Sequence, residues 1–295
     1  MLKSFLALPN KFLRDRLFAD DVIRSVYEEI LLRSPAHSEI KNWRHYLKAL
    51  GILAFFKQVQ NSEEASALRA QIESQKVLFM HIPRTAGSSF RGFFERFTGF
   101  VYTSHAKQNP CPAEKACLIN GHFGFCFMNH TTYDHSFTIL RDPIQRVISL
   151  YRYGHSERSS WESSRKSQSY FFYEWLSSND TWIRSQIDSF YVRIITDDMP
   201  EPFENRIGKS VSIALKRYSD FSAVGDQSDL RPFCKRVSML LSLPSFSLPF
   251  VNDSRSLSRL TAKYPSRPKL TPEIQRRLGQ LTRLDYEIYN RFRAK

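Results

Sequence analysis

Apolar residues recur every three or four positions through residues 21–70, without the alternation that marks a half-buried strand. This spacing predicts helices over residues 22–32, 38–50 and 53–60, with a fourth helix after residue 62. Gly51 suits a C-cap between two of them, and the polar run from Asn61 to Glu64 suits an N-cap. The pattern therefore predicts a small all-helical segment over residues 1–73.

The hydrophobic pattern changes at residue 76, where a continuous apolar run replaces the helical spacing. A strand, a loop and a helix are predicted in turn over residues 76–82, 83–87 and 88–97, followed later by a strand over 136–141 and a helix over 144–153. Such alternation predicts an α/β fold with a P-loop-like parallel β-sheet flanked by helices. We accordingly expect an accessory helical module over residues 1–73 and a second domain over residues 76–295.

The composition excludes several protein classes. Of the 295 residues, 42% are hydrophobic and 14% aromatic, which excludes a disordered or low-complexity protein. No apolar stretch approaches the roughly 20 residues that a membrane-spanning helix needs, and the first residues lack the apolar core of a secretory signal. Four cysteines do not make a disulfide scaffold. We expect a cytoplasmic protein without a transmembrane segment, for which peripheral membrane contact stays open.

The charge gives the first indication of function. The formal net charge is +14, and the basic surplus is dense over residues 231–295. Such an excess predicts an anionic partner, which composition alone does not identify: nucleic acid, an anionic membrane, a polyanionic glycan or a phosphorylated cofactor. The absence of a zinc-finger or RNP1-type signature argues against nucleic acid.

The loop after the first predicted strand is the first candidate site. It reads His81-Ile82-Pro83-Arg84-Thr85-Ala86-Gly87-Ser88-Ser89. A loop from a buried strand to a helix start directs backbone amides and the positive end of the helix dipole at one point, which suits an anion. Ser88 and Ser89 add hydroxyl donors, and Arg84 adds a permanent cation. The alternative is an ordinary capped helix, and the missing Walker A lysine weakens an ATPase, GTPase or nucleotide kinase interpretation.

A second candidate site follows the strand predicted over residues 136–141. Arg141 closes that strand, and Ser149 lies two turns into the next helix, on one face with Arg146 and Tyr153. An arginine at a strand end and a serine on the helix together suit a second phosphate group. In the alternative interpretation the aspartate after Arg141 only caps the helix, and both arginines are exposed to solvent.

The two motifs together resemble the carbohydrate sulfotransferases of the heparan-sulfate 2-O and 6-O type and their bacterial relatives. Further matches in family order extend the resemblance over about residues 76–292, at residues 119–123, 221–225, 251–254 and 284–289. The resemblance implies 3′-phosphoadenylyl sulfate (PAPS) as the sulfuryl donor. Its 5′-phosphosulfate would bind at Arg84, Thr85, Ala86, Gly87, Ser88 and Ser89. Its 3′-phosphate would bind at Arg141 and Ser149, with Arg255 as an additional contact.

His122 is the candidate general base. Much of an imidazole with an ordinary pKa of about 6.5 is neutral near pH 7, and the Gly121-His122 position resembles the catalytic histidine of the family. The alternative is a structural histidine in an aromatic-rich segment. The family usually has lysine where Arg84 stands; arginine can stabilise the leaving phosphate but does not readily donate a proton. The mechanism requires no metal, and the cysteines and histidines lack zinc-ligand spacing.

The expected function is O-sulfation of a glycan hydroxyl, on a polysaccharide or oligosaccharide that includes anionic ones, by in-line displacement from PAPS. A lipid-linked saccharide or a tyrosyl protein is an alternative acceptor. The alternative from another class is a non-catalytic polyanion-binding protein. In related proteins the segment with Arg184, Gln186 and Arg193 often contacts cofactor or acceptor, and His81 is a candidate positioning or core residue.

The N-terminal helical segment has a resemblance of its own. Residues 26–33 and 61–64, with Trp43 and Gly51, resemble a short bacterial helical module of unassigned function, the DUF4214 type. The resemblance implies a bacterial source and an accessory role, and it implies no chemistry.

Overall fold

The structure, a computed structural model, describes residues 16–103, 113–155, 167–197, 207–248 and 267–293. The chain divides into two compact units. The first comprises residues 1–74 together with residues 234–247, and the second comprises residues 75–233 and 248–295. Each unit has a hydrophobic core of its own.

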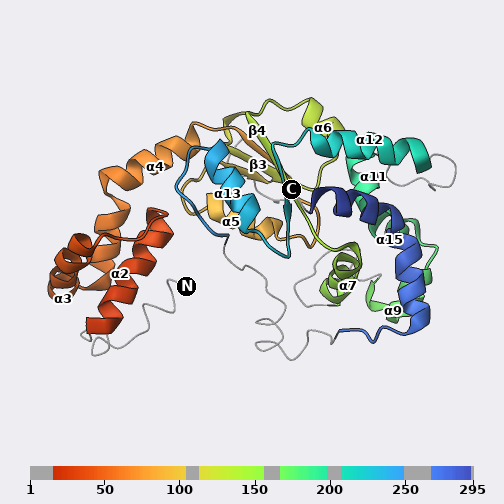
Figure 1. Cartoon of the computed structure of the whole chain (residues 1–295), viewed down its shortest axis with the longest axis horizontal. Helices are drawn as coiled ribbons and strands as arrows, with labels where there is room; N and C mark the ends of the chain where they lie inside the picture. Colours follow the sequence, from red (N-terminus) through yellow and green to blue (C-terminus); the bar gives the residue numbers. More distant parts are fainter. Residues whose placement is uncertain (1–15, 104–112, 156–166, 198–206, 249–266, 294–295) are drawn as a thin grey trace. The chain divides into compact units, whose positions relative to one another are not determined.

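The described N-terminal helices are α2 (Arg16–Ile30), α3 (His37–Gln60) and α4 (Glu63–Glu73) (Figure 1). Gly51 is a kink inside α3, where φ is 82° and the helices predicted over 38–50 and 53–60 meet. Glycine suits this position because a left-handed φ strains other residues. The hydroxyl of Ser62 caps α4 as expected, since it accepts a hydrogen bond from Ala65 N at 3.1 Å.

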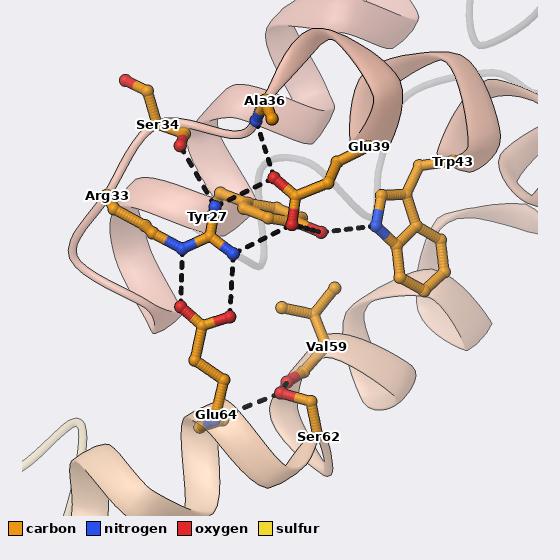
Figure 2. A network of polar contacts seen from close by, with 10 residues as sticks. Tyr27, Arg33, Ser34, Ala36, Glu39, Trp43, Val59, Ser62 and Glu64 are labelled. Carbon is orange, nitrogen blue, oxygen red and sulfur yellow. Dashed lines mark hydrogen bonds and ion pairs between the residues drawn. The ribbon is translucent and has the colours of Figure 1, made fainter.

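A polar network joins these three helices at their turns (Figure 2). The guanidinium of Arg33 donates to both carboxylate oxygens of Glu39 at 2.9 Å and to those of Glu64 at 2.5 and 2.8 Å. Trp43 Nε1 donates to the hydroxyl of Tyr27 at 2.6 Å, and that hydroxyl donates to Glu39 at 3.3 Å. The hydrogen bond from Arg33 is the main reason that the pKa of Glu39 falls to about 2. The network therefore fixes the turns before and after α3.

Within the described residues, the second unit is built on a five-stranded parallel sheet. Its strands are β1 (Val77–Met80), β2 (Val101–Thr103), β3 (Leu118–Gly121), β4 (His135–Leu140) and β5 (Ala223–Asp226). They are arranged in the order β2-β3-β1-β4-β5, and every pairing is parallel. The strands predicted over 76–82 and 136–141 are β1 and β4, and the predicted α/β fold class is confirmed.

Helices cover both faces of this sheet. The described helices of the second unit are α5 (Gly87–Phe94), α6 (Phe125–Asn129), α7 (Pro143–Gly154), α9 (Phe172–Ser177), α10 (Thr181–Ile187), α11 (Phe190–Thr196), α12 (Ile207–Ser219) and α15 (Pro272–Phe292), with a 3₁₀ turn at Ala113–Lys115; α13 (Arg231–Leu240) begins in this unit and continues into the first. Alternate residues of β1 point to opposite faces. Leu78 belongs to a core with Tyr191 of α11 and Ile288 of α15, whereas Phe79 stacks on Phe90 of α5 at 4.3 Å between ring centroids. Helices thus bury the central strand from both sides.

A separate hydrophobic cluster holds α7 in place. It joins Ile148 of α7 to Trp175 of α9, Ile183 of α10 and Leu281 of α15, all with less than a tenth of their surface exposed. Because α7 starts directly after β4, this cluster also sets the direction in which the chain leaves the sheet.

The strand order determines where a site can form. The chain runs from β1 toward β2 on one side of the sheet and from β4 to β5 on the other side. In sheets of this kind ligands bind beyond the carboxyl ends of the strands, where the connections diverge. The loop over residues 81–86 follows β1, and Arg141 follows the neighbouring strand β4. Both candidate sequence motifs therefore lie at the divergence point.

Candidate functional site

The loop from β1 to α5 is the first part of the site. Thr85 is fully buried, and its hydroxyl donates to the carbonyl of Ile82 at 2.8 Å, which closes the loop on itself. Arg84 and Ala86, on either side, have φ values of 71° and 73°. Such conformations cost non-glycine residues about 1–3 kcal/mol each. Left-handed residues within a loop of this kind form concave arrays of backbone amides, which suit anions.

The first turn of α5 adjoins this loop. A side chain at Gly87 would collide with the imidazole of His81, since a Cβ there would lie 1.9 Å from His81 Cδ2. Only glycine therefore lets the His81 ring lie against the start of the helix. Ser88 is half-buried, and the buried Ser89 directs its amide to the carbonyl of Ala86 at 2.9 Å. Both serines lie in the first turn of α5, at the end of a helix that attracts anions.

Three of the predicted site residues meet beyond the strand ends. Arg84 Nε donates to Ser149 Oγ on α7 at 3.1 Å, and the Arg84 guanidinium lies over the ring of Tyr153, 4.5 Å from its centroid. Arg141 Nη1 donates to the carbonyl oxygen of Arg84 at 3.2 Å, across 57 positions of sequence. The two sequence motifs thus form one cluster of cations and hydroxyls.

Arg146 does not belong to this cluster, although it shares α7 with Ser149. Its side chain is fully buried, donates to the carbonyl of Gln186 at 2.6 Å and lies over the ring of Phe190 at 4.4 Å. Burial lowers the pKa of this guanidinium. The alternative in which Arg146 is exposed to solvent is therefore wrong, and its contacts are those of a core residue.

Two tyrosines hold the residues between β4 and α7, one through a side chain and one through the main chain. Asp142 Oδ1 accepts from Gln145 N at 2.9 Å, which is the predicted helix cap, and Oδ2 accepts from the hydroxyl of Tyr286 at 2.7 Å. Burial and this hydrogen bond raise the pKa of Tyr286. The hydroxyl of Tyr191 donates to Arg141 O at 2.6 Å and accepts from Arg141 N at 3.1 Å. Both tyrosines come from helices that are distant in sequence.

Sequence reasoning did not identify Tyr191. It stands in the apolar run from Phe190 to Ile195, which reads as an ordinary buried helix. The identity of its partner, 50 positions earlier, depends on the packing of α11 against the end of β4. Tyr286 lies inside the 284–289 segment that resembles the family, and this was its only signal.

His122 directly follows β3, the neighbour of β1 on the side away from β4. Its Nδ1 is hydrogen-bonded to the main-chain oxygen of His81, and the two imidazole rings are 4.5 Å apart between centroids. Because a carbonyl oxygen only accepts, this contact assigns a proton to Nδ1, so in the neutral imidazole the lone pair is on Nε2. A general base that acts through Nε2 needs this tautomer.

The segment after His122 is anchored by Asp197 at the end of α11. Asp197 Oδ2 accepts from Cys126 N at 2.8 Å. A side chain at Gly124 would collide with the same carboxylate, since a Cβ there would lie 1.9 Å from Asp197 Oδ1. Together these contacts fix the path of the chain as it leaves His122.

The remaining candidates lie elsewhere. Arg184 and Arg193 both face the carboxylate of Asp188, at 2.6 and 3.9 Å, and Arg193 is buried. Gln186 offers its main-chain oxygen to Arg146. Arg255 lies outside the described residues.

The groups that meet beyond the strand ends are suited to anions. Arg84 and Arg141 carry permanent charges, Ser149 carries a hydroxyl, and α5 directs its N-terminal end at the same loop. This donor set fits a ligand with two phosphate groups, such as PAPS. Among the described residues no group of three or more His, Cys, Asp or Glu side chains is arranged to hold a metal ion, and no described helix combines the length and hydrophobicity needed to cross a membrane.

Comparison with known proteins identifies one family. The family model described as "Sulfotransferase family" matches residues 71–292. That range contains the whole sheet, the loop after β1, and the cluster formed by Arg84, Arg141 and Ser149. No curated protein matches the chain.

Proposed function

The chain belongs to the sulfotransferase family and is a PAPS-dependent sulfotransferase; on this premise we propose that its acceptor is a hydroxyl group of a polysaccharide or oligosaccharide. One observation carries the assignment of the site. Arg84, Arg141 and His122 follow β1, β4 and β3, which are adjacent strands. The cationic groups and a candidate base therefore lie beyond the carboxyl ends of the same strands.

In this proposal two groups of residues bind the donor. The segment over residues 84–89, with the Arg84 side chain, binds the 5′-phosphosulfate, and Arg141 and Ser149 bind the 3′-phosphate. The 3.1 Å hydrogen bond between Arg84 and Ser149 supports the proposal, because it puts both groups within reach of one nucleotide. Arginine binds phosphate through charge-assisted hydrogen bonds, which are stronger than neutral ones. Arg255 stays a candidate for an additional contact with the 3′-phosphate.

When bound, PAPS supplies a sulfuryl group attached to a phosphate leaving group. His122 takes the proton of the acceptor hydroxyl at Nε2, while its Nδ1 keeps the hydrogen bond to the His81 carbonyl that orients the ring. Arg84 and the loop amides stabilise the negative charge that develops at the leaving phosphate. Arginine keeps its proton throughout the physiological pH range, so Arg84 acts through its charge and not as an acid.

The charge and the motifs support a glycan acceptor. A net charge of +14 attracts an anionic saccharide over long range, and the ordered motifs resemble those of carbohydrate sulfotransferases. A lipid-linked saccharide or a protein hydroxyl would use the same donor chemistry. The acceptor class is therefore a matter for assay.

Calorimetric titration tests the donor assignment. We expect the protein to bind adenosine 3′,5′-bisphosphate far more tightly than ADP or ATP. Arg141→Ala should weaken that binding by about 10- to 150-fold, since a hydrogen bond to a charged group contributes roughly 1.5–3 kcal/mol. Equal binding of ATP would contradict the assignment and favour a protein that binds polyanions without reaction.

Transfer of radiolabelled sulfate from PAPS tests the acceptor and the base. We expect labelled glycans and no labelled lipid-linked saccharide or protein when each class is offered separately. His122→Ala should abolish transfer and retain binding of adenosine 3′,5′-bisphosphate, because the base contacts the acceptor and not the nucleotide. A parallel loss of nucleotide binding would show that His122 has a structural role.

A further inference from the structure

We infer that Tyr191 is a positioning residue of the donor site, because its hydroxyl holds the main chain of Arg141. This inference rests on the proposed function, in which the Arg141 side chain binds the 3′-phosphate of the donor. Tyr191 need not contact the nucleotide. It acts by setting the point from which the Arg141 guanidinium extends.

One phenol satisfies both main-chain groups of Arg141. The Tyr191 hydroxyl donates to the carbonyl oxygen at 2.6 Å and accepts from the amide at 3.1 Å. Arg141 stands one residue beyond the last pair between β4 and β5, which joins Leu140 to Asp226. The sheet therefore ends before Arg141, and the tyrosine takes the place of a strand partner there.

Tyr191 is itself fixed by two other helices. Its side chain is fully buried, its amide donates to Asp285 Oδ1 of α15 at 2.8 Å, and its carbonyl accepts from the hydroxyl of Tyr218 of α12 at 3.1 Å. Burial raises the pKa of Tyr191, so the phenol keeps the proton that it donates to Arg141. The hydroxyl is thus a fixed point next to a backbone that leaves the sheet.

The Arg141 side chain extends from this fixed point toward the other half of the site. Its Nη1 donates to the carbonyl oxygen of Arg84 at 3.2 Å. Removal of the Tyr191 hydroxyl leaves the ring in the core but releases the peptide groups on both sides of Arg141. Because a charged contact depends on distance and angle, a released Arg141 should lose a large part of its interaction with a 3′-phosphate.

The test compares Tyr191→Phe with Tyr218→Phe. Both changes remove one hydroxyl from a fully buried phenol, but the Tyr218 hydroxyl binds the Tyr191 carbonyl and not Arg141. Calorimetry with adenosine 3′,5′-bisphosphate and with adenosine 5′-monophosphate gives the ratio of dissociation constants that the 3′-phosphate produces. We expect Tyr191→Phe to reduce this ratio about tenfold, within the range for a charged hydrogen bond, with unchanged binding of the monophosphate. Tyr218→Phe should change the ratio much less, because Asp285 still holds the main chain of Tyr191 and the hydroxyl that binds Arg141 is still present.

The outcomes separate this inference from the proposed function. A Tyr191→Phe ratio equal to that of the wild type, or an equal loss of affinity for both nucleotides, overturns the positioning role. If the wild type does not distinguish the two nucleotides, or Arg141→Ala leaves the ratio unchanged, the donor assignment fails and the inference with it. Hydrogen exchange of the wild-type protein gives a check that needs no variant: the Arg141 amide should be protected, and exchange at the rate of an open loop would contradict the bond to Tyr191.

Discussion

Asp285 on α15 is a carboxylic acid without exposed surface. Its Oδ1 accepts from Tyr191 N at 2.8 Å, whereas Oδ2 has no hydrogen-bond partner within the described part of the chain. Burial raises the pKa of Asp285 from 3.8 to about 7, although the positive charge of Arg146 acts to lower it. The variant Asp285→Asn keeps the acceptor and the shape of the neutral acid, but it does not titrate.

The direction of the pH effect follows from this raised pKa. Between about pH 4 and pH 7 the folded protein binds more protons at Asp285 than the unfolded chain does, so the free energy of unfolding falls as the pH rises. One pKa unit corresponds to about 1.4 kcal/mol, so the rise from 3.8 to about 7 is equivalent to about 4 kcal/mol over the whole window. The free energy of unfolding of Asp285→Asn does not fall in this way, because asparagine does not titrate.

Urea unfolding at a series of pH values measures the effect. Between about pH 4.5 and pH 8, we expect the free energy of unfolding of Asp285→Asn to gain about 3 kcal/mol relative to the wild type, the part of the total that falls in this range. Glu287→Gln, an exposed position on the same helix, is the control for a lost negative charge. A difference that stays constant within about 1 kcal/mol would refute the reasoning, because it would mean that Asp285 is ionised throughout.

Two further changes test the loop after β3 and the cluster beyond β1. Gly124→Ala places a methyl group 1.9 Å from Asp197 Oδ1, so overpacking should cost about 1–3 kcal/mol and lower the melting temperature in calorimetry. Gly279→Ala is a control that should not lower it, because beyond the adjacent backbone of its own helix no heavy atom lies within 4 Å of the new Cβ. Arg84→Lys keeps the charge but loses the Nε hydrogen bond to Ser149, so kcat in the transfer assay should fall about 10- to 100-fold at an unchanged melting temperature. An unchanged kcat would show that the charge alone is sufficient.

Local patterns predicted the N-terminal helices and the first strand and helix units, but not α12 or the long helix α15. The apolar runs of β1 and β4 and the helices that follow them carry their own signals, since burial on both faces requires continuous hydrophobic residues. The pattern did not predict β2, β3 and β5. β2 has only three residues, and polar residues and glycine interrupt the apolar runs of β3 (Leu-Ile-Asn-Gly) and β5 (Ala-Val-Gly-Asp), whereas β1 is apolar throughout. Gly51 gave a correct signal of a left-handed backbone but not of a kink between two joined helices.

The sequence likewise identified residues of the candidate site but not their arrangement. Arg84, Arg141 and Ser149 were identified because loops and helices after buried strands have a known chemistry that the residue types reveal, and His122 was identified from the family resemblance. Their proximity depends on the strand order β3-β1-β4. Residue spacing contains no information on that order.

The sequence by itself determined the α/β class, the two phosphate-type motifs and the candidate base, since each depends on residues that are close along the chain. Only the tertiary structure decided that Arg146 is buried in the core while Ser149, on the same helix, faces Arg84. Only the tertiary structure placed the Tyr191 hydroxyl against the main chain of Arg141, 50 positions away. The physical reason is that these contacts arise when helices pack onto a sheet, and packing joins residues whose separation in sequence is arbitrary.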